Sequence, residues 1–140
     1  MLAIIVHAAE NFCQHQLRLP FERIESSPKK RTLLAYIDVE EKNALLHRVY
    51  IGCDEALMQR ISEIFLGEDE SDEQTLIDML LETTNMIVGS AKVLAEESYE
   101  TTISIMTPFF VSDDTSKGEL QEVQHLSIDN CEMMIALKRL

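Results

Sequence analysis

Residues 73–97 have the sequence EQTLIDMLLETTNMIVGSAKVLAEE, in which apolar positions recur at helical spacing. Acidic residues at positions 72 and 73 stand at the start of this run, where they suit the positive end of a helix dipole. Plotted at about 100° per residue, one broad face of the helix is apolar. That face predicts the contact with the core, and it comprises Leu76, Ile77, Leu80, Leu81, Ile87, Val88, Ala91, Leu94 and Ala95.

The opposite face of the same helix carries residues that a purely structural helix would avoid. Glu82 lies almost diametrically opposite the core and Asn85 lies one turn further on, so both side chains are expected to point to solvent together. Asn85 is a poor helix former in mid-helix, and Gly89 costs about 1 kcal/mol relative to alanine there. Asp78 lies one turn before Glu82, and Met86 adds adaptable apolar area beside the face. These five residues predict a docking surface for a protein partner.

The rest of the chain predicts a small α+β domain. Further helices are expected at residues 2–16 and 54–65, the second closed by Gly67. Alternating apolar runs predict strands at residues 31–39, 44–51, 101–106, 109–111, 122–128 and 131–137, with Gly52 ending the second of them. A shorter run at residues 21–26 is a further strand candidate. We therefore expect an antiparallel sheet of about five or six strands covered by three helices, in a single domain spanning residues 1–140.

The chain is strongly acidic, with 25 acidic residues against 12 basic ones and a net charge of −13. Such a surface repels phosphate backbones and anionic lipids, so nucleic acid and membranes are not expected as partners. It favours a partner with a basic patch, although the same charge also serves solubility.

The three cysteines make no Cys-x-x-Cys pair, and the apolar N-terminal run is far shorter than a membrane span. A cytoplasmic protein with reduced, mostly buried thiols is expected.

Other chemistry-bearing residues do not form a recognisable site. The four histidines lie far apart, and none has metal-ligand spacing with a cysteine or an acid, so no metal ligand is assigned. Ser90 lacks the Gly-x-Ser-x-Gly context of a hydrolase nucleophile. Structural or surface roles are expected for all of these residues.

Four residues form a spaced signature, Asp78-x3-Glu82-x2-Asn85-x22-Pro108. A match to all four positions is expected by chance in roughly one chain in several hundred. With this signature the chain resembles the CheC/CheX/FliY family of chemotaxis phosphatases, and the string ETTNMIVGSAK at residues 82–92 also has the look of that family. The chain holds one copy of the motif, whereas CheC and FliY members generally carry two, so it is most similar to the CheX branch.

The resemblance implies a CheC/CheX-like fold and hydrolysis of the phosphoaspartate of CheY, a response regulator, by a homodimer. It also implies that Mg²⁺ and a lysine come from the receiver domain of the partner, so that this chain binds no cofactor itself. A carboxamide both donates to and accepts from water, so Asn85 is expected to hold the attacking water in line with the phosphorus. Glu82 is expected to pair with the partner's lysine. Asp78 is expected to orient the docking surface, and Pro108 to be structural.

Two other functions fit the same surface. A non-catalytic adaptor would dock on a response regulator or a flagellar switch component, but it has no need of an exposed mid-helix Asn85 beside Glu82, so this pair favours the enzyme. An interaction module whose acidic face binds a basic partner would show salt-sensitive binding that does not depend on phosphorylation of the partner.

Overall fold

The computed structural model describes residues 1–25, 32–42, 45–111 and 122–140. The predicted strand ends at positions 26, 31 and 44 lie outside these residues. The elements follow in the order α1 (Leu2–Asn11), the π-helical turn η1 (Phe12–Leu17), β1 (Phe21–Ile24), β2 (Thr32–Glu41), β3 (Leu45–Asp54), α2 (Glu55–Leu66), α3 (Glu73–Ser98), β4 (Ile103–Ile105), β5 (Phe109–Val111), β6 (Glu122–Ile128) and β7 (Cys131–Arg139).

The strands form one antiparallel sheet in the order β1-β6-β7-β3-β2-β4, and β5 also pairs with β2. The sheet has seven strands where the sequence predicted five or six. β4 pairs with β2 around Glu40 and β5 pairs with it around Ala35, so the two short strands follow one another along the same edge of β2. The α+β class and the antiparallel sheet with three α-helices are confirmed.

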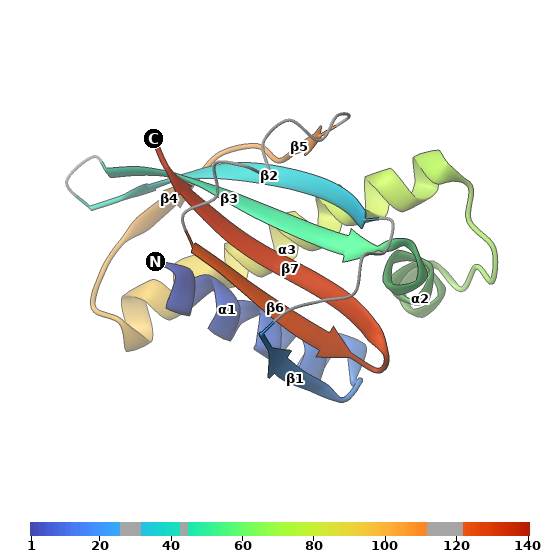
Figure 1. The fold of residues 1–140 in the computed structure, drawn as a ribbon. Helices are drawn as coiled ribbons and strands as arrows, with labels where there is room; N and C mark the ends of the chain where they lie inside the picture. The colour runs from blue at the N-terminus through green and yellow to red at the C-terminus, as the bar shows by residue number, and fades with distance from the viewer. Residues whose placement is uncertain (26–31, 43–44, 112–121) are drawn as a thin grey trace.

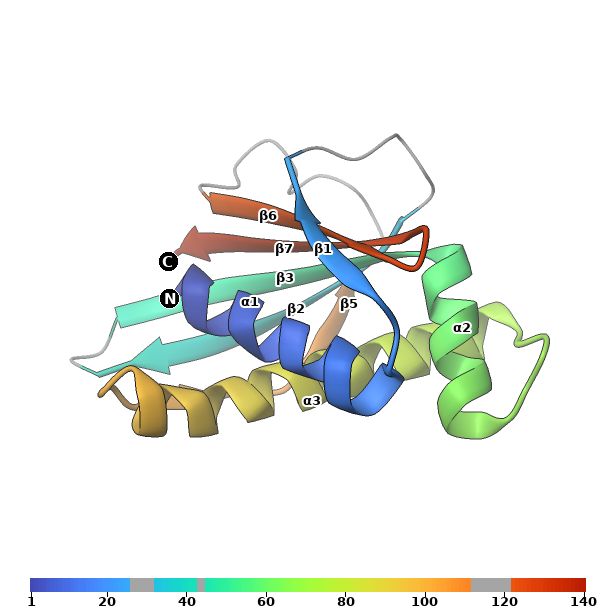
Figure 2. The same ribbon diagram turned by 90° about the horizontal axis from the view of Figure 1, so that it is seen from below.

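All three α-helices lie on the same side of the sheet (Figure 1). α1 and α3 run antiparallel to each other beneath the strands, and α2 stands at one end of the sheet (Figure 2). Strand residues alternate between the two faces, and those that point at the helices form the core. Fully buried examples are Ile37, Ile51, Met133 and Ile135 on the sheet, with Ile5 and Leu80 on the helices.

The buried face of α3 is the predicted one, with additions. Of the nine apolar residues predicted to face the core, six are buried and three are half-buried, namely Ile77, Leu81 and Leu94. Met79, Thr83 and Thr84 are buried as well. The hydroxyl of Thr84 donates to the carbonyl of Leu80 at 2.8 Å, which allows a polar side chain to lie in the core.

Helices α2 and α3 begin at side-chain caps. Asp54 accepts a hydrogen bond from the Leu57 backbone N–H at 2.7 Å, and its second oxygen accepts from the Glu132 N–H at 3.0 Å, which ties the start of α2 to β7. Asp72 accepts from the Thr75 N–H at 2.8 Å, and this bond lowers the pKa of the Asp72 carboxyl. Gly67 ends α2 in the left-handed conformation with φ 71°, as predicted.

The prediction that Gly52 ends a strand is wrong. β3 continues through Gly52 to Asp54, and Gly52 is paired with Leu34 on β2 and Met134 on β7. A Cβ at this position would lie 3.0 Å from the Thr32 Cγ2 atom, so the glycine permits close approach of a neighbouring strand's side chain. Local sequence cannot distinguish such a glycine from one that terminates a strand.

Candidate functional site

Asp78, Glu82 and Asn85 form a ridge on the outer face of α3, and all three side chains are exposed. The Asp78 carboxylate accepts a hydrogen bond from the Gln74 side chain at 2.9 Å, within the same helix. Among the described residues, neither the Glu82 carboxylate nor the Asn85 amide has a hydrogen-bond or ion-pair partner. Their bonding capacity is therefore directed at solvent or at another molecule.

An open groove runs along one side of this ridge. It has a volume of about 350 Å³ and lies between Asp78, Leu81, Glu82 and Asn85 of α3 and the segment Met106, Thr107 and Pro108 that joins β4 to β5. The structure thus brings all four residues of the spaced signature to one groove. Pro108 forms part of its wall opposite the helix.

The spacing of 22 residues between Asn85 and Pro108 follows from this geometry. From Asn85 the helix runs 13 more residues to Ser98, about 20 Å at 1.5 Å per residue. Glu100 then adopts the left-handed conformation with φ 52°, and the chain reverses into β4. An extended chain advances about 3.3 Å per residue, so the segment from Ile103 to Pro108 returns most of the way back toward Asn85.

Met86 and Gly89, the other two residues of the predicted docking surface, do not line this groove. Met86 is half-buried and faces a second hollow on the other side of α3, toward α1. Gly89 lines neither hollow, and a Cβ added there would meet no described atom within 4 Å other than those of its chain neighbours and of the nearby helix backbone. The five predicted residues therefore span the ridge and both of its sides.

No cluster of three or more His, Cys, Asp or Glu side chains that could hold a metal occurs within residues 1–25, 32–42, 45–111 and 122–140. The histidines are dispersed: His7 contacts the Tyr99 hydroxyl at 3.2 Å, and His47 contacts Glu41 at 3.3 Å. The prediction that Mg²⁺ arrives with the partner stays a prediction.

The three cysteines are buried and form no disulfide, as predicted. Burial is the main cause that raises the pKa of Cys13 to about 12, and burial also raises the pKa of Cys53. Both thiols therefore stay protonated at neutral pH and are poor nucleophiles. In the described part of the chain, no helix combines the length and apolar character that crossing a bilayer requires.

The protein family described as chemotaxis phosphatase CheX matches residues 40–129, a range that includes the complete signature. The chain belongs to the CheX family. No curated protein matches it by sequence. The wall of the groove also includes Met106 and Thr107, which sequence reasoning did not assign to the site, and Leu81, which it assigned to the core. Nothing local marks Met106 and Thr107, because only the pairing of β4 and β5 with β2 brings the segment 106–108 to the helix.

Several solved structures share the CheX fold. The chemotaxis protein CheX from Vibrio vulnificus has a TM-score of 0.80 at 20% identity, covering 99% of this chain and 95% of that one. CheX from Desulfovibrio desulfuricans has a TM-score of 0.73 at 17% identity, with 99% and 97% covered. The CheX–CheY–BeF3–Mg²⁺ complex from Borrelia burgdorferi has a TM-score of 0.68 at 15% identity, with 97% and 96% covered.

We predict that Gly89→Ala stabilises the free protein by about 1 kcal/mol, because alanine is the better helix former and its methyl group enters open space. Urea unfolding followed by circular dichroism measures the change. The same substitution at Gly52 is the control, and it should destabilise the protein because its methyl group would lie 3.0 Å from Thr32. A loss of stability in Gly89→Ala would show that α3 does not tolerate a side chain at this position.

Proposed function

We propose that this chain is a phosphatase that hydrolyses the phosphoaspartate of a response-regulator receiver domain, with a CheY-like chemotaxis regulator as the substrate. The observation that carries the proposal is the pair formed by Glu82 and Asn85. Both side chains are exposed on the ridge, and neither has a hydrogen-bond or ion-pair partner among the described residues. Both border the groove whose opposite wall includes Pro108. A pair held in this way is available to a second protein that presents its phosphoryl group to the ridge.

Asn85 suits the task of placing a water molecule. A phosphoaspartate is an acyl phosphate, which is already prone to hydrolysis, so positioning and charge stabilisation supply most of the acceleration. The water oxygen bonds to phosphorus while the bond from phosphorus to the aspartyl oxygen breaks, the carboxylate leaves, and the protons of the water pass to phosphate and solvent. The Asn85 amide accepts from or donates to this water and holds it in line without acting as a base.

Glu82 suits the task of docking. Its carboxylate lies one turn from Asn85 on the same ridge, where it would accept a charge-assisted hydrogen bond from the lysine of the receiver's active site. Mg²⁺ bound by the receiver would neutralise charge on the phosphoryl group. Asp78 is held by Gln74 and extends the acidic edge of the groove, which supports a role in orienting the partner.

The Asn85→Ala variant should lower kcat about 100-fold or more and change KM little, because it removes the group that positions the water. The measurement is the decay of a phosphorylated CheY-like receiver with Mg²⁺, alone and with each protein. Glu97→Ala is the control, an exposed position on α3 that lines neither hollow. Binding of the receiver without acceleration by the wild-type protein would favour the adaptor instead.

The Glu82→Gln variant should weaken binding of the receiver by about 10- to 100-fold, as expected for loss of a hydrogen bond between charged groups. The wild-type affinity should fall as salt rises, and the variant should depend on salt less. Binding to the receiver activated with beryllofluoride measures both effects. Glu97→Gln removes the same charge elsewhere on α3 and is the matched control. Equal losses in the two variants would indicate a general effect of charge and no specific pair.

We also infer, from the resemblance and the acidic surface, that the protein acts in the cytoplasm as a homodimer. Sedimentation velocity should give twice the chain mass of 16.0 kDa at micromolar concentration. A monomer at all concentrations that support phosphatase activity would contradict the dimer and leave the enzymatic proposal in place.

A further inference from the structure

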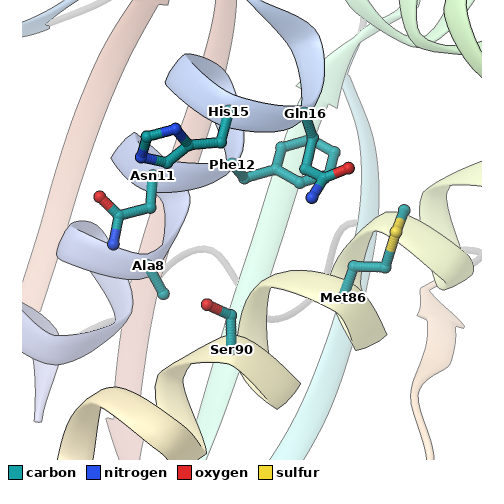
Figure 3. Close-up of a pocket in the computed structure, with 7 residues that line it drawn as sticks. All are labelled: Ala8, Asn11, Phe12, His15, Gln16, Met86 and Ser90. Atoms are coloured by element: carbon teal, nitrogen blue, oxygen red, sulfur yellow. The ribbon is translucent and has the colours of Figure 1, made fainter. Parts of the chain in front are cut away.

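The hollow on the α1 side of the ridge is the larger of the two that border it, with a volume of about 390 Å³. Figure 3 shows Met86 and Ser90 of α3 on one side of this hollow, across from the side chains at the end of α1 and in η1. We call it the interhelical cleft, and it is lined by Ala8, Asn11, Phe12, His15, Gln16, Met86 and Ser90.

The helix face that forms one wall of the cleft changes character along its length. Positions 8, 11, 12, 15 and 16 have the spacing of a single helical face, and the face begins with buried Ala8 and Phe12. A face turned toward a neighbouring helix is ordinarily apolar throughout. Here Asn11, His15 and Gln16 share the face with Ala8 and Phe12, so the face becomes polar at the end of α1 and in η1.

The polar groups of the cleft are not used within the protein. In the described part of the chain, Asn11, His15, Gln16 and Ser90 make no side-chain hydrogen bond or ion pair. Internal hydrogen bonding therefore does not explain why these side chains line the cleft. Phe12 fixes the floor, because it is buried and stacks on Phe65 of α2 with ring centroids 6.1 Å apart.

The end of the helix has an unusual backbone. η1 is a π-helical turn, and Arg18 ends it in the left-handed conformation with φ 56°. π-Helical turns inside or at the end of α-helices occur frequently at functional sites. The wider turn carries His15 and Gln16, the two polar residues of the cleft that lie farthest along this element.

The cleft and the groove lie on opposite sides of one ridge. Asn85 borders the groove, and the next residue, Met86, lines the cleft. A receiver domain that straddles the ridge to bring its phosphoryl group to Asn85 would therefore cover both hollows.

We infer that the interhelical cleft binds a surface loop of the same receiver domain, one that carries an apolar side chain between exposed peptide groups. This inference rests on the proposed function. Met86, Phe12 and Ala8 provide an apolar floor for the side chain, and methionine adapts to its shape. Asn11, Gln16 and Ser90 provide donors and acceptors for peptide N–H and C=O groups.

The chemistry of the cleft differs from that of the groove. Asp78 and Glu82 line the groove, whereas the cleft has no acidic, lysine or arginine side chain in its lining, and His15 is its one titratable group. A lining without acidic, lysine or arginine side chains suits a neutral loop better than a charged one. Binding in the cleft should therefore depend little on salt, in contrast to the contact made by Glu82.

The test is the Ser90→Tyr variant, whose side chain would fill the cleft from an exposed helix position. We expect KM for the phosphorylated receiver to rise about tenfold or more and kcat to stay within about twofold of the wild-type value. The ratio of the variant's KM to the wild-type KM should be the same at high salt. Ser98→Tyr makes the identical change at the exposed end of α3, outside both hollows, and should behave as the wild-type protein. The double variant Asn11→Ala with Gln16→Ala removes two hydrogen-bonding groups without adding bulk and should raise KM about 5- to 20-fold.

The outcomes separate this inference from the function on which it rests. Rapid dephosphorylation by the wild-type protein together with an unchanged KM in Ser90→Tyr and the double variant would overturn the cleft as a docking site and leave the phosphatase in place. An unchanged KM accompanied by loss of the dimer in sedimentation would assign the cleft to a second copy of the chain and would also overturn the inference. A wild-type protein that neither binds nor dephosphorylates the receiver would overturn both proposals.

Discussion

The burial of one face of α3 against the sheet is the constraint on which the site depends. Leu80, Ile87 and Val88 are fully buried there, and each such side chain contributes about 1.5–3 kcal/mol when removed from water. Rotating α3 about its own axis by about 100°, the angle between neighbouring residues, would expose apolar surface and bring Glu82 toward the core. This rotation would cost several kcal/mol. The orientation of Glu82 and Asn85 is therefore fixed by packing on the opposite face, before any partner binds, which is the pre-organisation that positioning catalysis requires.

The sequence predicted what depends on local periodicity and missed what depends on distant pairing. The helices, the bounds of β5 and β6, and the capping glycine of α2 were predicted because each leaves a signal within a few residues. Gly52 was misinterpreted because its neighbours Leu34 and Met134 come from other strands. Thr83 and Thr84 were not assigned to the core, since a buried threonine requires either a helical carbonyl acceptor or close packing that composition does not reveal.

The candidate site divides in the same way. Asp78, Glu82 and Asn85 lie on one helix and could be placed by a helical wheel, while Pro108 was connected to them by the family signature. The structure adds that Met86 faces away from the groove, so a set of residues predicted as one surface has two sides of different chemistry. The acidic side suits recognition of charge, which governs encounter and orientation, and the neutral side suits close packing, which governs residence time.

The break between β4 and β5 has a consequence for the protein in solution. β2 is a strand of ten residues, and an uninterrupted neighbour along its edge would itself present a long row of free N–H and C=O groups, a template on which strands from other molecules can assemble. β4 and β5 are each three residues long, and Pro108 between them has no N–H to donate. Pro108, which forms part of the groove wall, thus also interrupts the row of hydrogen-bonding groups on which another strand could pair at this edge. A substitution there would put the solubility of the protein at risk even if the chemistry of the ridge were untouched.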